Sequence, residues 1–160
     1  MLSNLISKLP DGRAENELVN YLRTLSEDEK AFVIEGMFMH HSTLVRGSAL
    51  RVIPRVVRDR GVLINFLDMG LEIKNISGTK LWVKATVSGL GYKRLLKHLQ
   101  KIAEVEPEWI VYAWYQLVPL VRKEAPEHMN ILVKIRDTVD IRLSSELESF
   151  WQRNKDAVPL

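Results

Sequence analysis

Apolar residues recur every three or four positions along most of the chain, a spacing that predicts amphipathic α-helices. In residues 92–104, for example, Leu95, Leu96, Leu99 and Ile102 fall on one side of a helix. Residues 108–123 are apolar on nearly every face, which is typical of a buried helix. We expect about eight short antiparallel helices, at residues 14–25, 26–39, 43–60, 62–73, 92–104, 108–123, 126–139 and 144–154, with a further short one at residues 2–9.

Capping and breaking residues mark where these helices begin and end. Ser26 and Glu29 form a capping box, in which the hydroxyl accepts a free N–H and the glutamate reaches back. Pro107 fits the first position of a helix. Pro54 is expected to bend the helix at residues 43–60, and Gly61 to stop it.

One segment leaves the fold class open between two alternatives. Residues 80–87 are rich in β-branched side chains, so they form either the helix 79–90, capped by Thr79, or a strand of a mixed α/β fold. No long alternating run accompanies them, and we therefore expect an all-α protein that folds as a single domain over residues 1–160.

Two segments of the chain resemble each other around a proline. Ile53-Pro54-Arg55-Val56-Val57-Arg58-Asp59 parallels Val118-Pro119-Leu120-Val121-Arg122-Lys123-Glu124. A proline that bends the first helix of an antiparallel pair resembles the HEAT-type helical repeats, and the likeness covers residues 43–140. HEAT units run to about 40 residues or more, whereas the spacing of these prolines needs shorter units. The alternative is an irregular α-bundle in which the prolines are coincidental kinks.

Composition narrows the possible classes of protein. The 160 residues include no cysteine, which excludes disulfides, thiolate catalysis and cysteine-based zinc sites. No apolar run reaches the ~18 residues that span a bilayer, so we expect no membrane partner. The first residues lack the basic and apolar regions of a signal peptide, which favours the cytoplasm.

The residues that could carry chemistry are scattered. His40 and His41 point about 100° apart on a helix, and no HExxH or GxSxG motif is present. Ser88-Gly89-Leu90-Gly91 lacks the lysine of a phosphate-binding loop, and Asp137 and Asp140 lie beside arginines that can pair with them. We therefore expect no catalytic residue, no metal site and no cofactor, and hence a protein that is not an enzyme.

Positive charge is concentrated in the middle of the chain. Residues 42–105 carry twelve basic and four acidic side chains, although the whole chain has a net charge of only +3. The basic residues recur at helical spacing, so that each of three helices presents a cationic row. The candidate binding residues are Arg51, Arg55, Arg58, Lys80, Trp82, Lys84, Lys93, Arg94, Lys97 and Lys101.

Three interpretations of these rows remain open. They could dock an acidic protein surface, track a phosphate backbone with Trp82 or Tyr92 stacking on bases, or form an ordinary solvated exterior. We favour a non-enzymatic protein-protein interaction domain, similar in broad character to small cytoplasmic inhibitors of immunity or antitoxin type. Inhibitors of nucleases bind through acidic surfaces, so Glu27, Asp28 and Glu29 form an alternative acidic binding face. A nucleic-acid-binding helical domain is the alternative function.

Overall fold

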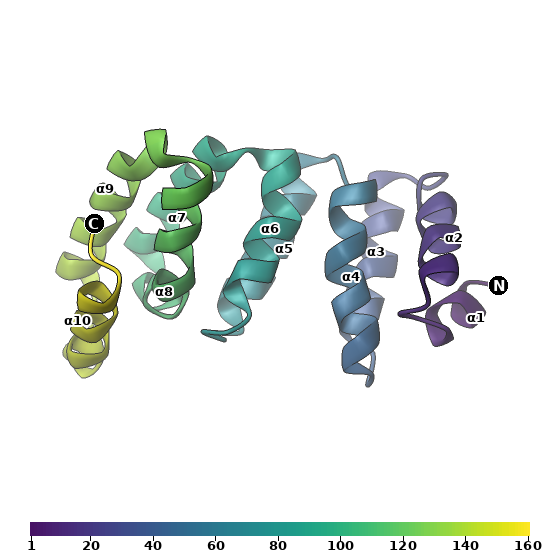
Figure 1. Ribbon diagram of the computed structural model, residues 1–160, viewed down its shortest axis with the longest axis horizontal. Coiled ribbons are helices and arrows are strands. Elements are labelled where there is room, and N and C mark those ends of the chain that lie inside the picture. The colour runs from purple at the N-terminus through teal and green to yellow at the C-terminus, as the bar shows by residue number, and fades with distance from the viewer. The chain divides into compact units, whose positions relative to one another are not determined.

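The computed structural model describes residues 1–160 as an all-α protein without strands (Figure 1). Its α-helices are α1 (Leu2–Ser7), α2 (Gly12–Leu22), α3 (Glu27–Phe38), α4 (Thr43–Val56), α5 (Arg60–Glu72), α6 (Thr79–Leu90), α7 (Tyr92–Val105), α8 (Pro107–Glu124), α9 (Met129–Arg142) and α10 (Glu148–Ala157). Short 3₁₀ turns at Pro126–His128 and Ser145–Leu147 precede the last two helices. The chain forms two compact units, residues 1–63 and 64–160, and the boundary falls within α5.

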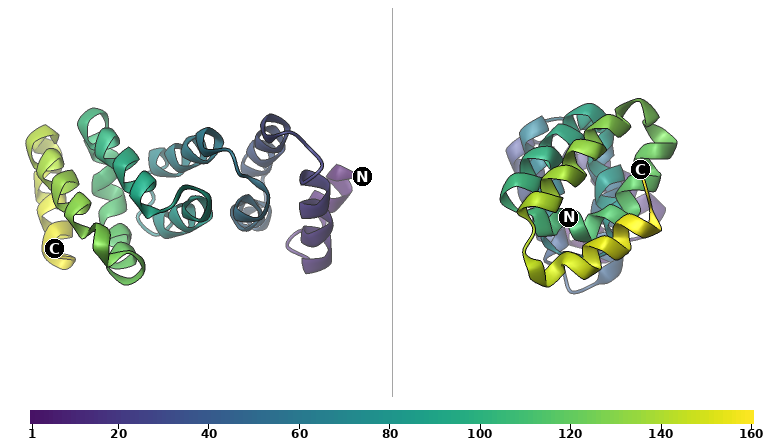
Figure 2. Two further views of the ribbon diagram at one scale, coloured as in Figure 1. Left: turned by 90° about the horizontal axis from the view of Figure 1, so that it is seen from above. Right: turned by 90° about the vertical axis from the view of Figure 1, so that its left-hand side faces the viewer.

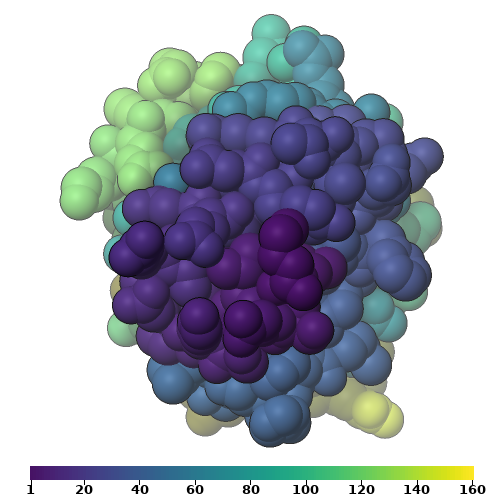
Figure 3. All heavy atoms as spheres, turned by 90° about the vertical axis from the view of Figure 1, so that its right-hand side faces the viewer, coloured from purple at the N-terminus to yellow at the C-terminus, as the bar shows by residue number.

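The first unit is built around α4. Helices α2 and α3 both pack against α4, and α1 packs against α2. Leu18, Ile34 and Val52 come from the three larger helices and are fully buried. Figure 3 views this unit from the end that carries α1 and α2, which are drawn in the darkest purple.

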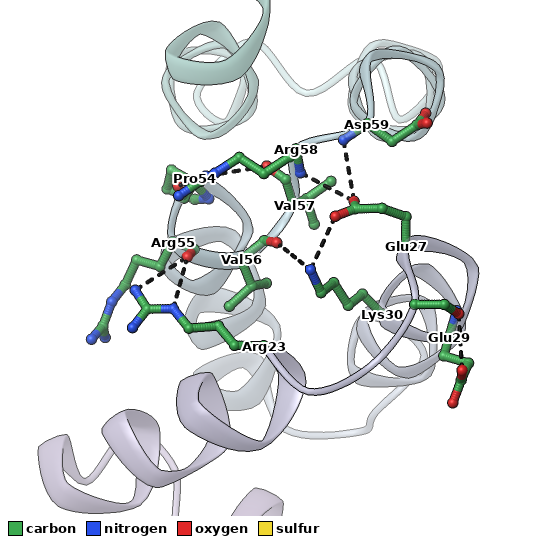
Figure 4. Close-up of polar contacts among 11 residues, drawn as sticks. Arg23, Glu27, Glu29, Lys30, Pro54, Arg55, Val56, Val57, Arg58 and Asp59 are labelled. Atoms are coloured by element: carbon green, nitrogen blue, oxygen red, sulfur yellow. Dashed lines mark hydrogen bonds and ion pairs between the residues drawn. The ribbon is translucent and has the colours of Figure 1, made fainter.

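A buried lysine ties α3 to the end of α4 (Figure 4). Lys30 donates to the carbonyl of Val56 at 2.9 Å and to Glu27 at 3.0 Å. Glu27 in turn accepts from the backbone N–H groups of Arg58 and Asp59, at 3.1 and 3.2 Å. These contacts hold the turn between α4 and α5 against the first turn of α3.

Several helix ends differ from those expected. The helix predicted at residues 43–60 ends at Val56, because the Glu27 carboxylate holds the next backbone N–H groups in a turn. Gly61 does not stop a helix but lies in the first turn of α5. The Ser26 hydroxyl accepts from the Glu29 N–H, as a capping box requires, and donates to the Glu29 carboxylate.

The segment at residues 80–87 is helical, so the α/β alternative is wrong. Its β-branched residues are used on a buried helix face, where Val83 and Thr86 are both fully buried. The Thr86 hydroxyl donates to the carbonyl of Trp82 at 2.9 Å, which satisfies the hydroxyl inside the helix.

The second unit is arranged around α8. This helix packs against α6, α7, α9 and α10 (Figures 1 and 2). Trp114 at its middle is fully buried. The all-round apolar pattern therefore correctly predicted a central helix. Neither α8 nor any other helix is long and apolar enough to cross a membrane.

Polar contacts attach the flanking helices of this unit. Asn154 of α10 donates to the buried carbonyl of Val111 in α8 at 2.9 Å. Trp151 donates to Asp140 of α9 at 2.7 Å. On the other side, His98 of α7 lies 2.7 Å from Asp68 of α5.

Gly70 of α5 makes room for Trp82 of α6. A Cβ atom added at Gly70 would lie 2.8 Å from the Trp82 Cβ and would overlap the first atoms of its ring. Because these atoms lie at the base of the side chain, they cannot move aside without moving the helix. The close approach of α5 and α6 therefore depends on a glycine at this position.

We expect Gly70→Ala to lower the free energy of unfolding by about 1–3 kcal/mol, the usual range for overpacking. Gly36→Ala is the matched control, because an added Cβ there meets nothing within 4 Å. At an exposed helical position, alanine also has a higher helix propensity than glycine. Urea denaturation of the wild type and both variants measures the difference. An equal decrease in the free energy of unfolding in both variants would contradict the proposed fit of Trp82 against Gly70.

Glu27→Gln is expected to lower the free energy of unfolding at about pH 7 by about 1–3 kcal/mol. Burial by itself raises the pKa of Glu27, but hydrogen bonds from Lys30 and from the N–H groups of Arg58 and Asp59 lower it below 4.5. The stabilisation is therefore present above the unfolded pKa and is lost as the pH falls through the folded pKa.

The measurement compares urea denaturation of the wild type and Glu27→Gln at about pH 7 and about pH 3. The difference in the free energy of unfolding between the wild type and Glu27→Gln should be smaller at the lower pH. Glu35→Gln, on the same helix, serves as the control and should show no such change. A difference that stays constant with pH would show that the Glu27 charge contributes nothing.

Candidate protein-docking surface

The arginine row at residues 51, 55 and 58 lies in the first unit and is engaged there. Arg51 donates to Glu15 at 3.0 Å, and Arg55 donates to Asn16 at 2.9 Å. Arg58 lies beyond the end of α4 and donates to the carbonyl of Pro54 at 3.0 Å. The row therefore binds neighbouring groups of its own unit, and Arg58 helps to cap a helix C-terminus.

The three residues of the alternative acidic face do not act together. Glu27 is held by Lys30 and by the turn after α4 (Figure 4). Asp28 is exposed at the surface of α3, as is Glu29, whose carboxylate accepts from Ser26. Of these three side chains, only those of Asp28 and Glu29 are therefore directed to solvent.

The remaining candidate cations belong to two packed helices of the second unit. Lys80 and Lys84 lie on α6, and α7 carries Lys93, Arg94, Lys97 and Lys101. All six side chains are exposed. Lys84 lies 4.0 Å from Glu124, and the other five form no ion pair within this distance. The structure thus brings the α6 and α7 rows together within one unit.

A glutamine of α8 fixes the start of α6. The side chain of Gln116 accepts from the Lys80 backbone N–H at 2.6 Å and donates to the Ser77 carbonyl at 3.0 Å. Thr79 was expected to cap this helix, but it is the first helical residue and its hydroxyl donates to the Asn75 carbonyl. The cap therefore comes from α8, which also sets where Lys80 lies.

A hollow of about 290 Å³ lies between α6 and α8. We call it the tyrosine groove, because Tyr115 is half exposed in its wall. Lys80, Lys84 and Lys123 supply its positive charge. Pro119 has no N–H to donate to the Tyr115 carbonyl, so this carbonyl is left as an acceptor beside the groove. The complete lining is Lys80, Lys84, Tyr115, Gln116, Pro119, Leu120, Lys123 and Glu124.

Glu124 connects the tyrosine groove with the start of α7. Its carboxylate accepts from the Tyr92 hydroxyl, and burial together with this contact raises the pKa of Tyr92. The phenol therefore stays protonated and keeps its hydrogen bond. Beyond it lies a second hollow of about 490 Å³, which we call the α7 hollow, lined by Leu90, Gly91, Tyr92, Lys93, Arg94, Lys97 and His128.

Trp82 does not belong to this surface. It was expected to stack on a ligand, but it is 9% exposed and packs against Gly70. Tyr92, the other aromatic residue considered for stacking, is engaged with Glu124. The ring of Trp82 is therefore buried away from the cations, and the hydroxyl of Tyr92 is held by Glu124.

The sequence analysis missed Tyr115 and Lys123. Both lie in the segment that was assigned as a whole to the core because of its apolar character. A signal was present nonetheless, since Tyr115, Pro119 and Lys123 are spaced by four and share one helix face. A proline and a lysine beside a tyrosine mark that face as the exposed one.

The lining residues supply ammonium groups, an aromatic ring and a carbonyl, which can bind anionic and polar groups of a partner. Comparison of the chain with models of protein families, with curated proteins and with solved structures found no match.

Proposed function

We propose that the chain is a non-enzymatic protein-interaction domain and that its second unit docks an acidic protein surface at the tyrosine groove. The observation that carries this proposal is the half-exposed Tyr115 beside lysines that have few partners of their own. Tyrosine is enriched among the residues that dominate binding energy, and surrounding charges select and orient the partner.

The fold supports a binding role within the second unit. From α6 to α9 each helix packs against the next one, and α6, α7 and α8 each pack against the next but one, as in a helical array. We retain the HEAT-like array as a proposal for this unit. The two prolines are not equivalent, however, because Pro54 lies in the last turn of α4 whereas Pro119 lies well inside α8.

An inhibitor of immunity or antitoxin type is the form of this function that we favour, acting in the cytoplasm. Such a protein works by covering its target, so it needs a preformed surface and no chemistry of its own. The Gln116 contacts support this, because they hold α6 against α8 without a partner present. The target would present carboxylates to the three lysines.

Affinity capture from nuclease-treated lysate should retain a protein partner that depends on the tyrosine groove. The double variant Tyr115→Ala/Lys84→Glu is expected to weaken binding of the purified partner by at least about tenfold, as loss of an anchor residue does. Ile141→Ser is the control, because Ile141 is exposed elsewhere, on α9. A captured protein that binds the double variant as tightly as the wild type would exclude this groove.

One observation favours a second function, binding to nucleic acid. Lys93, Arg94, Lys97 and His128 converge on the α7 hollow, and none of the first three is paired with a carboxylate. Groups arranged in this way can neutralise phosphates, which makes binding strongly dependent on salt.

For this second function, Lys93→Glu/Lys97→Glu should weaken binding to a duplex DNA oligonucleotide and reduce the salt slope by about 2, because each phosphate contact contributes about 0.9. The control variant Lys8→Glu/Arg13→Glu makes the same change in net charge at two exposed residues of the first unit. Fluorescence anisotropy over a range of salt concentrations measures both slopes. Equal slopes for the two variants would show that only the overall charge matters.

A further inference from the structure

Helix α3 buries a lysine and exposes a phenylalanine. Lys30 is 8% exposed, whereas Phe32, two residues later, is 78% exposed. The burial of Lys30 is explained by its hydrogen bonds to Val56 and Glu27. Little of the first unit covers the ring of Phe32, although burial of a phenylalanine would stabilise the fold.

The exposed phenylalanine belongs to a complete outer face of α3. Asp28, Phe32, Glu35 and Met39 are spaced by four, three and four residues and therefore lie along one side of the helix. Met39 is 85% exposed. In Figure 3 the segment of α3, indigo on the colour bar, lies at the surface of the molecule.

A shallow groove runs beside this face. It has a volume of about 310 Å³ and combines an apolar floor with an acidic edge. Its lining residues are Tyr21, Leu25, Asp28, Glu29, Phe32 and Val33. Asp28, Glu29 and Glu35 form no ion pair with any cation of the chain, so their charges are available to a partner.

We propose that the outer face of α3 docks a cationic amphipathic helix of a partner protein. Phe32 and Met39 lie about two helical turns apart on this face, so one partner helix can pack against both side chains. The free carboxylates lie beside these anchors and complement lysine or arginine on the same partner helix. This site is separate from the tyrosine groove, and it selects the opposite charge.

The same charges disfavour the two other occupants of an exposed apolar face. A second copy that paired through this face about a two-fold axis would set carboxylates against carboxylates. An anionic membrane surface would be repelled by the same three groups. A cationic helix is the occupant that satisfies both the apolar anchors and the acidic edge.

The test uses an about 18-residue helical peptide of lysine and leucine, with a glutamate and leucine peptide of the same pattern as its counterpart. Binding to the full chain is measured by isothermal titration calorimetry, and the bound surface is mapped by ¹⁵N chemical shifts. We expect the lysine peptide to bind with shifts centred on α3, and the glutamate peptide to cause none there.

Two variants and one control identify the site. Phe32→Ser should weaken binding of the lysine peptide by at least about tenfold, as loss of an anchor does. Asp28→Asn/Glu29→Gln/Glu35→Gln should weaken binding and reduce its salt dependence. Ile141→Ser removes an equally exposed apolar side chain, 81% exposed on α9, and should leave the affinity unchanged.

Two results would overturn the proposal. One is a lysine peptide that binds the wild type, Phe32→Ser and the triple variant equally well, or that does not bind at all. The other is a dimer in sedimentation experiments that Phe32→Ser converts to a monomer, which would assign the face to a second copy. Since neither the lysine peptide nor the variants involve the tyrosine groove, failure here leaves that groove to its own test.

Discussion

The end of helix α4 presents backbone carbonyl groups that its own helix cannot satisfy, and cationic side chains meet them (Figure 4). Arg58 donates to the carbonyl of Pro54, Arg23 to that of Arg55, and Lys30 to that of Val56. These donors come from three different segments, so satisfying one helix end also orders its surroundings. The positive charges suit the negative end of the helix dipole, and they stabilise this end of α4.

The two candidate surfaces carry unpaired charges of opposite sign. On the outer face of α3, Asp28, Glu29 and Glu35 form no ion pair, and in the tyrosine groove Lys80 and Lys123 form none. Each set lies near one exposed aromatic side chain, Phe32 or Tyr115. The small net charge of +3 thus conceals local charge of both signs.

Periodicity predicted the helices well because it reflects local geometry, in which each buried stripe repeats along its own segment. Periodicity did not predict burial where a residue that is distant in sequence determines it. Lys30 is buried because the end of α4 needs a donor, and Trp82 is buried because Gly70 makes room for it. The helix α3 is apolar on both sides, so its pattern alone could not show that Phe32 faces solvent. Of the arginine row expected on one helix, only Arg51 and Arg55 lie on α4, because the helix ends before Arg58. Their contacts with Glu15 and Asn16 depend on residues that lie far away in sequence.

An exposed aromatic ring and the charged side chains beside it have different roles in recognition. Ionic attraction between exposed groups is screened within about 8 Å at physiological salt, so it guides approach and rejects partners of the wrong sign. Burial of the ring is less sensitive to salt and supplies the lasting part of the affinity. A charged row without such a ring would bind many anions weakly. The half-exposed ring of Tyr115 beside Lys80, Lys84 and Lys123 is therefore the reason why we propose a specific protein partner for this surface and not a general attraction to anions.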